Sequence, residues 1–305
     1  MKAKELQVFK LTEKFKEEKD KVLNSTKLPP LVSWMSQVDD YDIPNDLSNL
    51  FLVLRKKLLI SKSIIFRLSS FSNSYGFLGS LYLVGDWLEA YCFKKIGNFV
   101  DVLTILTDVK LFNTHMFCSL LRDMYLYILQ ITKILSCDDK TLISNKLLNK
   151  YLMNKNNDFI FDIRKKSGDF ESIFKKIADE INKLKENDIC KQQYLKIKNI
   201  FNDKFIDNLC DYVHHNHYSN DHPYFFPFAI GNTQWGKNKL NYCIETFNKI
   251  FNLFLIIIYL FHSISFANMF DYISELEITG KYPSTDLNKE SEENFEWFIE
   301  EFNKI

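Results

Sequence analysis

Four of the six histidines in this 305-residue chain lie in one short polar stretch, CDYVHHNHYSNDHP, which begins at Cys210. Imidazole exchanges protons near neutral pH, so this cluster suggests acid–base chemistry. If the preceding helix continues to His217, then Asp211, His214 and His217 share one face at three-residue spacing. Two imidazoles and a carboxylate are candidate metal ligands, but they do not by themselves complete a transition-metal site. We therefore assign no metal or other cofactor.

The same stretch also fits the end of a helix. Histidines in a last helical turn interact favourably with the helix dipole and can donate to the last carbonyls. Pro223 would then end the segment. The residue types thus leave three interpretations open: a helix C-terminus, an acid–base or RNA-cleaving site, and a metal site.

Arg122 is the second candidate, within the apolar stretch FCSLLRDMYLYILQI. Burying a guanidinium without a partner is costly. The residues one helical turn away cannot neutralise it; they are Cys118, Ser119, Tyr125 and Leu126. We therefore expect a partner on another helix, with three candidate carboxylates: Asp86, Glu89 and Asp211. The alternative to such a structural ion pair is a phosphate-binding arginine.

Composition narrows the function classes. The chain has 39 basic and 39 acidic residues, so no overall field attracts it to nucleic acid or to anionic lipid. It contains no GxGxxG, GxxxxGK[ST], HExxH, GxSxG or CxxC motif, which argues against nucleotide-dependent ATPases, zincins and α/β-hydrolases. The charged N-terminus lacks the apolar core of a secretory signal, and the six cysteines are scattered. We expect a cytoplasmic protein with reduced cysteines.

Only 8 glycines and 6 prolines occur, and long periodic apolar runs separate them. This pattern predicts an all-α, multi-helix bundle with one large domain. We expect an N-terminal helix and loop over residues 1–46 and a helical core over 47–305, with a peripheral charged helix at 167–187. The helices expected within this layout are 1–24, 47–70 with Asp46 as N-cap, 77–96 ended by Gly97, 99–135 with a break near Asn113, 138–156, 167–184, 188–213 with a break near Asn202, 240–270 and 290–302. Loops are expected at 28–44 and 218–237.

Residues 250–267, IFNLFLIIIYLFHSISFA, are long and apolar enough to cross a bilayer. Asn252 and His262 interrupt the run, however, and no asymmetric cluster of Lys or Arg flanks it. A helix buried on all sides of a large core has the same composition. The sequence favours the buried helix, and we expect no membrane partner.

Two windows, LLRDMYLYI around Arg122 and DNLCDYVHHNHY ending near His217, resemble helical prokaryotic proteins of the HEPN superfamily. That superfamily includes RNases of toxin–antitoxin and abortive-infection systems. Many members carry an Arg a few residues before a His at a helix end. In this chain His214 would take the place of the His, while Asn208 stands where the Arg is expected.

The resemblance implies a helical bundle, a homodimer with its site across the subunit interface, and a role in antiviral defence or as a toxin. It also implies an RNA substrate, metal-independent RNA cleavage, and a protein partner such as an antitoxin. The candidate catalytic residues are His214, Asn208, Arg122 and His217. Two alternatives stay open: a non-catalytic helical interaction or regulatory module, and a metal-dependent hydrolase.

Overall fold

The structure is a computed structural model, which describes residue 24 and residues 45–72, 92–108, 112–136, 167–213 and 233–305. Those residues form α-helices and short 3-10 helices, and they contain no strand. The prediction of an all-α, multi-helix fold is therefore confirmed. The elements are α2 (Asn45–Ser72), α4 (Lys94–Leu106), α5 (Thr114–Leu135), α8 (Ser167–Lys183), α9 (Ile189–Ile197), η4 (Lys198–Ile200), α10 (Asp203–Val213), α11 (Thr233–His262), η5 (Ser263–Phe266), α12 (Met269–Thr279) and α13 (Leu287–Asn303).

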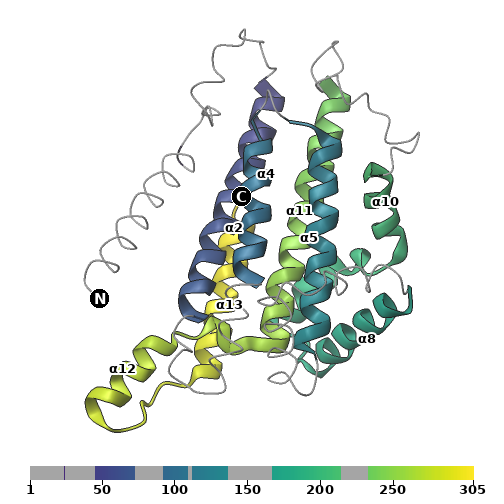
Figure 1. Cartoon of the computed structure of the whole chain (residues 1–305). Helices are drawn as coiled ribbons and strands as arrows, with labels where there is room; N and C mark the ends of the chain where they lie inside the picture. Colours follow the sequence, from purple (N-terminus) through teal and green to yellow (C-terminus); the bar gives the residue numbers. More distant parts are fainter. Residues whose placement is uncertain (1–23, 25–44, 73–91, 109–111, 137–166, 214–232) are drawn as a thin grey trace, which may run out of the picture.

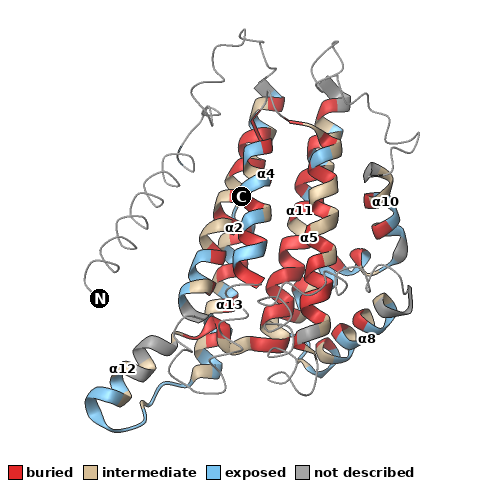
Figure 2. Cartoon of the chain, in the orientation of Figure 1, coloured by how far each residue is buried: buried red, intermediate tan, exposed pale blue. Residues whose placement is uncertain are grey.

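The long apolar helix α11 is the centre of the bundle. It packs against α5 on one side and α2 on another, while α4 pairs with α2 and α10 lies against α5 (Figure 1). Every residue from 250 to 258 is buried, and the burial view shows these turns among the other helices (Figure 2). By length and composition, the stretch Gly236–Phe266 could cross a membrane. Its burial against neighbouring helices agrees with the buried-helix interpretation.

Phenylalanine rings join the helices of this core. Phe251 of α11 lies 4.8 Å from Phe302 of α13, and Phe254 lies 6.2 Å from Phe93, both between ring centroids. Aromatic rings bury a large apolar area per side chain. The heavy use of Phe in the sequence is thus explained by helix packing. No disulfide joins the cysteines in the described part of the chain.

Both expected helix breaks occur at the asparagines named from the sequence. Asn113 accepts a hydrogen bond from the Met116 amide (3.1 Å) before α5 begins, and Asn202 accepts one from the Phe205 amide (2.8 Å) before α10. Such side-chain oxygens satisfy amides that a helix start leaves without a carbonyl partner. Asp188 caps α9 in the same way, through the amide of Cys190.

Several expected boundaries are wrong. Gly97 does not end a helix: it lies buried inside α4, where an added Cβ would sit 3.7 Å from the Ile65 side chain of α2. Gly97 therefore allows α4 to pack closely against α2 and does not end a helix. Asp46 is not the N-cap of α2, because the helix already begins at Asn45; its carboxylate pairs with Lys237 of α11 at 2.6 Å. Residues 233–237 are helical rather than loop, because α11 starts at Thr233. The helix expected at 240–270 ends at His262, and it is followed by η5 and by a separate helix, α12.

Some of the remaining expected helices are present in the structure, and others fall on residues that the structure does not describe. The charged helix at 167–184 is present as α8, with Ile173, Ile177 and Ile181 buried in the common core. The last acidic helix is present as α13 and begins earlier than expected, because Asp286 caps it. The expected helices at 1–24, 77–91 and 138–156, with the loops at 28–44 and 218–232, lie outside the described residues. The division into residues 1–46 and 47–305 stays a prediction.

Two cations of α2 are buried within the bundle, which the sequence did not reveal. Arg55 is only 2% exposed, and its guanidinium donates to the Thr107 hydroxyl (3.2 Å) and carbonyl (3.1 Å) at the C-terminus of α4. Burial lowers the pKa of Arg55 to about 10, against the charge of Asp108. A cation beside the carbonyl end of a helix is stabilised by the helix dipole. Arg55 thus joins α2 to α4.

Lys57 joins α2 to α13 in a similar way. Its ammonium donates to the Phe302 carbonyl at 2.6 Å and lies 4.7 Å from the centroid of the Phe302 ring. The residue is 3% exposed, and burial lowers the pKa of Lys57 to about 8. Farther along α2, the Arg67 guanidinium lies 4.1 Å from the ring centroid of Trp297. These contacts dock the C-terminal helix along α2.

Candidate functional site

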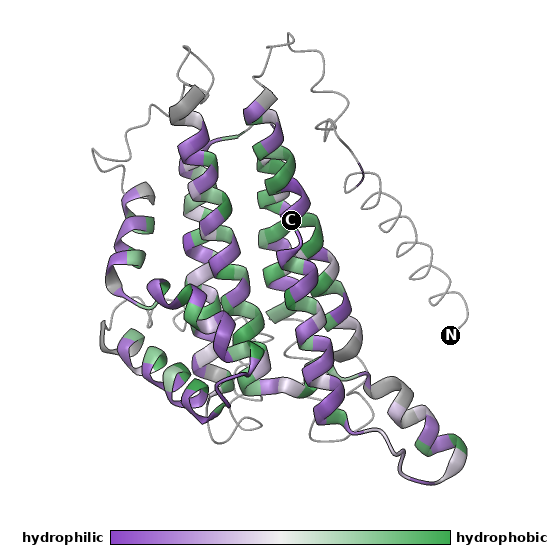
Figure 3. Ribbon diagram, turned by 180° about the vertical axis from the view of Figure 1, so that it is seen from behind, coloured by the Kyte–Doolittle hydropathy of each residue, from purple (hydrophilic) through white to green (hydrophobic). Residues whose placement is uncertain are grey.

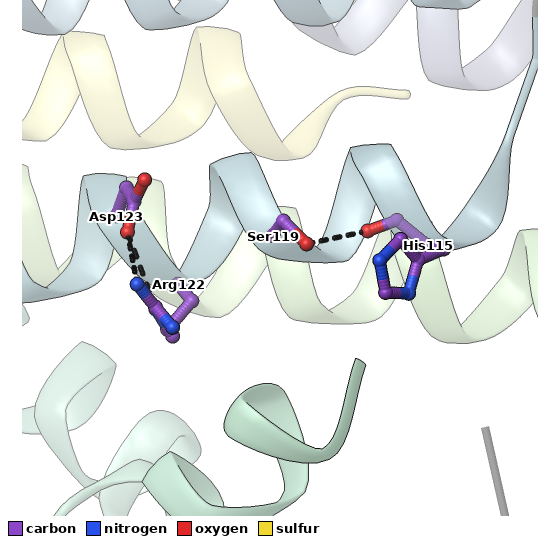
Figure 4. A network of polar contacts seen from close by, with 4 residues as sticks. All are labelled: His115, Ser119, Arg122 and Asp123. Atoms are coloured by element: carbon purple, nitrogen blue, oxygen red, sulfur yellow. Dashed lines mark hydrogen bonds and ion pairs between the residues drawn. The ribbon is translucent and has the colours of Figure 1, made fainter. Parts of the chain in front are cut away.

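Arg122 lies on the half-buried side of α5 and forms an ion pair with its sequence neighbour. Its Nη2 and Nε donate to Asp123 Oδ1 at 2.8 and 3.2 Å (Figure 4). The Arg122 side chain is 11% exposed and the Asp123 side chain 41%. The neutralising carboxylate is therefore on the same helix, not on another helix as expected. At the edge of a helix bundle, a long arginine side chain can turn back to the carboxylate of the next residue while both stay partly solvated.

α10 packs against α5, and the charge of Arg122 reaches Cys210 of α10. Burial raises the pKa of the Cys210 thiol, and the charges of Asp207 and Asp211 raise it further; the charge of Arg122 and its hydrogen bond oppose these effects. The thiol consequently stays protonated at neutral pH and is a poor nucleophile. This environment therefore does not activate Cys210 as the nucleophile of a Cys–His pair. The positive charge of Arg122 beside α10 could instead attract an anion.

Contacts at the start of α10 fix the helix beside α5. The Tyr125 hydroxyl of α5 donates to the Ile200 carbonyl at 2.7 Å, and its ring lies 5.2 Å from the Phe205 ring in an edge-on arrangement. Leu209 is fully buried on the same side of α10. A buried hydroxyl bonded to a backbone carbonyl removes an otherwise costly unsatisfied group. These contacts hold the segment that leads directly into the His-rich sequence.

Polar side chains continue along the same face of α5 as Arg122. His115, Ser119 and Arg122 have the spacing of one helix face, and all three are partly exposed. The Ser119 hydroxyl donates to the His115 carbonyl at 2.8 Å, and the His115 and Arg122 side chains point to the same side of α5 (Figure 4). An imidazole, a hydroxyl and a guanidinium in a row could contact a phosphate group. His115 is not among the residues predicted from the sequence, although its spacing from Arg122 is visible there.

The other predicted site residues divide into two groups. Asn208 is exposed on α10 and Asp211 is half-buried, and the charge of Arg122 acts on Cys210 between them in the sequence. His214 and His217 lie outside the described residues. Within the described part of the chain, no group of three His, Cys, Asp or Glu side chains is placed to hold a metal ion. The structure thus brings Arg122 to the helix that precedes His214, and it leaves the roles of the histidines as predictions.

Comparison with known protein families, with curated proteins and with solved structures finds no match for this chain.

Proposed function

We propose that this protein is a HEPN-like ribonuclease of a prokaryotic defence or toxin system, with its site where α10 leads into the His-rich segment. One observation carries the proposal: α10 packs against α5, so that the charge of Arg122 reaches Cys210, four residues before His214 in the sequence. A cation at this place can neutralise a phosphate that is presented to the following histidines. The sequence resemblance supplies the reaction class.

The proposed reaction is transesterification within RNA. One histidine, which we assign as His214, takes the proton of a ribose 2′-OH, and the 2′-oxygen attacks the adjacent phosphorus. The bond to the 5′-oxygen breaks, a second group such as His217 returns a proton to that oxygen, and a 2′,3′-cyclic phosphate is left. Arg122 stabilises the charge that builds on the phosphorane oxygens. A guanidinium has five N–H donors and can hold a carboxylate and a phosphate together, so Asp123 need not leave.

The decisive experiment uses the full chain and a labelled single-stranded RNA in the presence of EDTA. His214→Ala and Arg122→Gln should each lower the cleavage rate by about 100-fold or more, because each removes a transition-state contribution. Lys204→Ala is the matched control, since Lys204 is exposed on α10. Thermal melting of every variant separates loss of chemistry from loss of folding.

A substrate with a single 2′-deoxyribose at the cleavage position must resist the enzyme, because the nucleophile is then absent. An intact wild-type protein that leaves RNA uncut, or variants that cut as fast as wild type, would refute the proposal. The proposed homodimer is tested on the same samples by sedimentation. Growth arrest on expression in bacteria, relieved by His214→Ala, would support the toxin role.

A non-catalytic interaction module is the second candidate, and two observations favour it. Asp123 already balances the charge of Arg122, and Asn208 is an exposed amide where the resemblance expects an arginine. Under this alternative no RNA is cut, and substitutions of the histidines leave biological activity unchanged in a folded protein.

A further inference from the structure

The helical arm formed by α12 and the turn after it projects from the bundle, on the other side from α10 (Figure 1). Among the described elements α12 packs against α2, while its outer end is exposed (Figure 2). Ile278 is 84% exposed and Tyr282 is 81% exposed, far more than the other large apolar side chains of the described residues. Large, strongly exposed apolar side chains at the tip of a projecting element are a feature of protein-binding surfaces.

The arm is held in a defined shape. Gly280 adopts a left-handed conformation, with φ of 63°, and its amide donates to the Leu276 carbonyl at 2.8 Å. Thr279 Oγ1 donates to the Glu275 carbonyl and accepts from the Lys281 amide. Asp286 then caps α13 through the amides of Asn288 and Lys289. Because these hydrogen bonds fix the turn at both ends, the arm does not fold back on itself, and Ile278 and Tyr282 stay exposed to solvent.

The charge of this end of the chain indicates what could cover the arm. Residues 269–305 contain ten acidic and three basic residues, so they carry a net charge of −7, whereas the whole chain is neutral. The acidic residues include Glu275 and Glu277 beside the apolar tip, which are exposed. They continue along the exposed face of α13 as Glu292, Glu293, Glu296 and Glu300. Seen from behind, the ribbon of the projecting arm carries both hydrophilic and hydrophobic residues (Figure 3).

This charge discriminates between classes of partner. RNA and anionic lipid surfaces carry negative charge and would be repelled. Two copies of the arm meeting through a twofold axis would also place like charges together. A polypeptide segment with lysines or arginines beside apolar side chains is attracted by the acidic residues and can cover Ile278 and Tyr282. Of these partners, only the basic amphipathic segment meets both requirements.

We propose that the α12 arm and the adjoining acidic face of α13 form a docking surface for a basic, amphipathic segment of another protein. This surface is separate from Arg122 and from α10, so either proposal can fail without the other. The occupant contributes cationic side chains opposite Glu275, Glu277 and the α13 carboxylates. Its apolar side chains pack on Ile278 and Tyr282.

The test uses the full chain and a fluorescent helical peptide built from lysine and leucine, with anisotropy measured near physiological salt. Ile278→Ser combined with Tyr282→Ser keeps the charge and removes the apolar tip. Glu275→Gln combined with Glu277→Gln keeps the tip and removes charge. Each pair should weaken binding by about tenfold or more, as expected when central contacts of an interface are lost. The substituted side chains are exposed, so the thermal melting of these variants should match wild type.

Matched controls lie on the other side of the molecule. Leu195→Ser removes a 58% exposed leucine of α9, and Glu171→Gln combined with Asp179→Asn removes two exposed charges of α8. Both control variants should bind the peptide as wild type does. If they weaken binding as much as the arm variants, or if the apolar pair has no effect, attraction is non-specific and the proposal is overturned.

Other occupants give distinct results with the same variants. Retention of phosphatidylserine vesicles or single-stranded RNA that depends on Ile278 and Tyr282 would overturn the assignment of a basic protein segment. Sedimentation would overturn it as well if self-association of wild type disappeared in the Ile278→Ser, Tyr282→Ser variant, since the occupant would then be a second copy.

Discussion

Replacing the buried Lys57 with methionine should change how the stability of this protein depends on pH. The pKa of Lys57 is lowered from 10.5 to about 8 because the ammonium is buried between α2 and α13. Between these two values the unfolded chain keeps a proton that the folded protein has released. The free energy of unfolding therefore rises with pH in this window. Well below pH 8 Lys57 is protonated in both the folded and the unfolded state, so it does not make the free energy of unfolding depend on pH there.

The size of the effect follows from the two pKa values. Linkage predicts that titration of Lys57 raises the free energy of unfolding by about 2 kcal/mol as the pH increases from about 7 to about 9.5. Lys57→Met lacks this contribution, so the stability of wild type minus that of the variant should rise by the same amount. Near neutral pH the variant should be close to wild type, because an apolar side chain avoids burying a charge while losing the bond to the Phe302 carbonyl.

Urea unfolding of both proteins at several pH values measures this difference directly. Tyrosines and cysteines titrate in both proteins, so their effects cancel in the subtraction. Lys56→Met provides the matched control, since Lys56 is the preceding residue and is partly exposed. The reasoning is refuted if the wild-type minus Lys57→Met difference changes by less than about 0.5 kcal/mol across this range, or if Lys56→Met shows the same rise.

Three further substitutions test the packing. Gly97→Ala should stabilise the protein by about 1 kcal/mol in thermal or urea unfolding, because alanine favours helix and the space beside α2 accommodates a methyl group; destabilisation would show that the two helices need a closer approach. Tyr125→Phe should cost about 1–2 kcal/mol by leaving the Ile200 carbonyl without its donor, and native-state hydrogen exchange should increase in α10 rather than in α4. Arg55→Ala should cost about 3–5 kcal/mol in urea unfolding because it removes a buried cation that bonds Thr107, and Arg55→Lys should recover only part of this loss.

Local residue patterns predicted the helices well and their ends less well. Helix breaks could be placed near Asn113 and Asn202, and the structure shows each Asn side chain accepting from an amide within its own few residues. Gly97 was misjudged for the opposite reason. A glycine can end a helix or admit a neighbouring one, and only the position of Ile65 on α2 distinguishes the two cases.

In the candidate site, too, local sequence identified a residue, whereas its partners depended on the packing of helices. Arg122 could be singled out from the sequence, because a cation in an apolar helix is unusual. Its pairing with Asp123 rather than with a distant carboxylate depends on which side of α5 faces solvent. Cys210 was noticed only as a neighbour of the histidines, and its contact with Arg122 depends on how α10 docks on α5.

The sequence by itself determined that this protein is built from helices and that residues 250–258 could be buried, since periodicity and scarcity of Gly and Pro act within single segments. Only the tertiary structure decided where the charges lie. The burial of Arg55 and Lys57, the meeting of Arg122 with α10, and the exposure of Ile278 and Tyr282 all depend on which helices are neighbours. Charges and apolar side chains acquire their energies from surroundings supplied by residues far away in the chain, and local sequence does not contain that information.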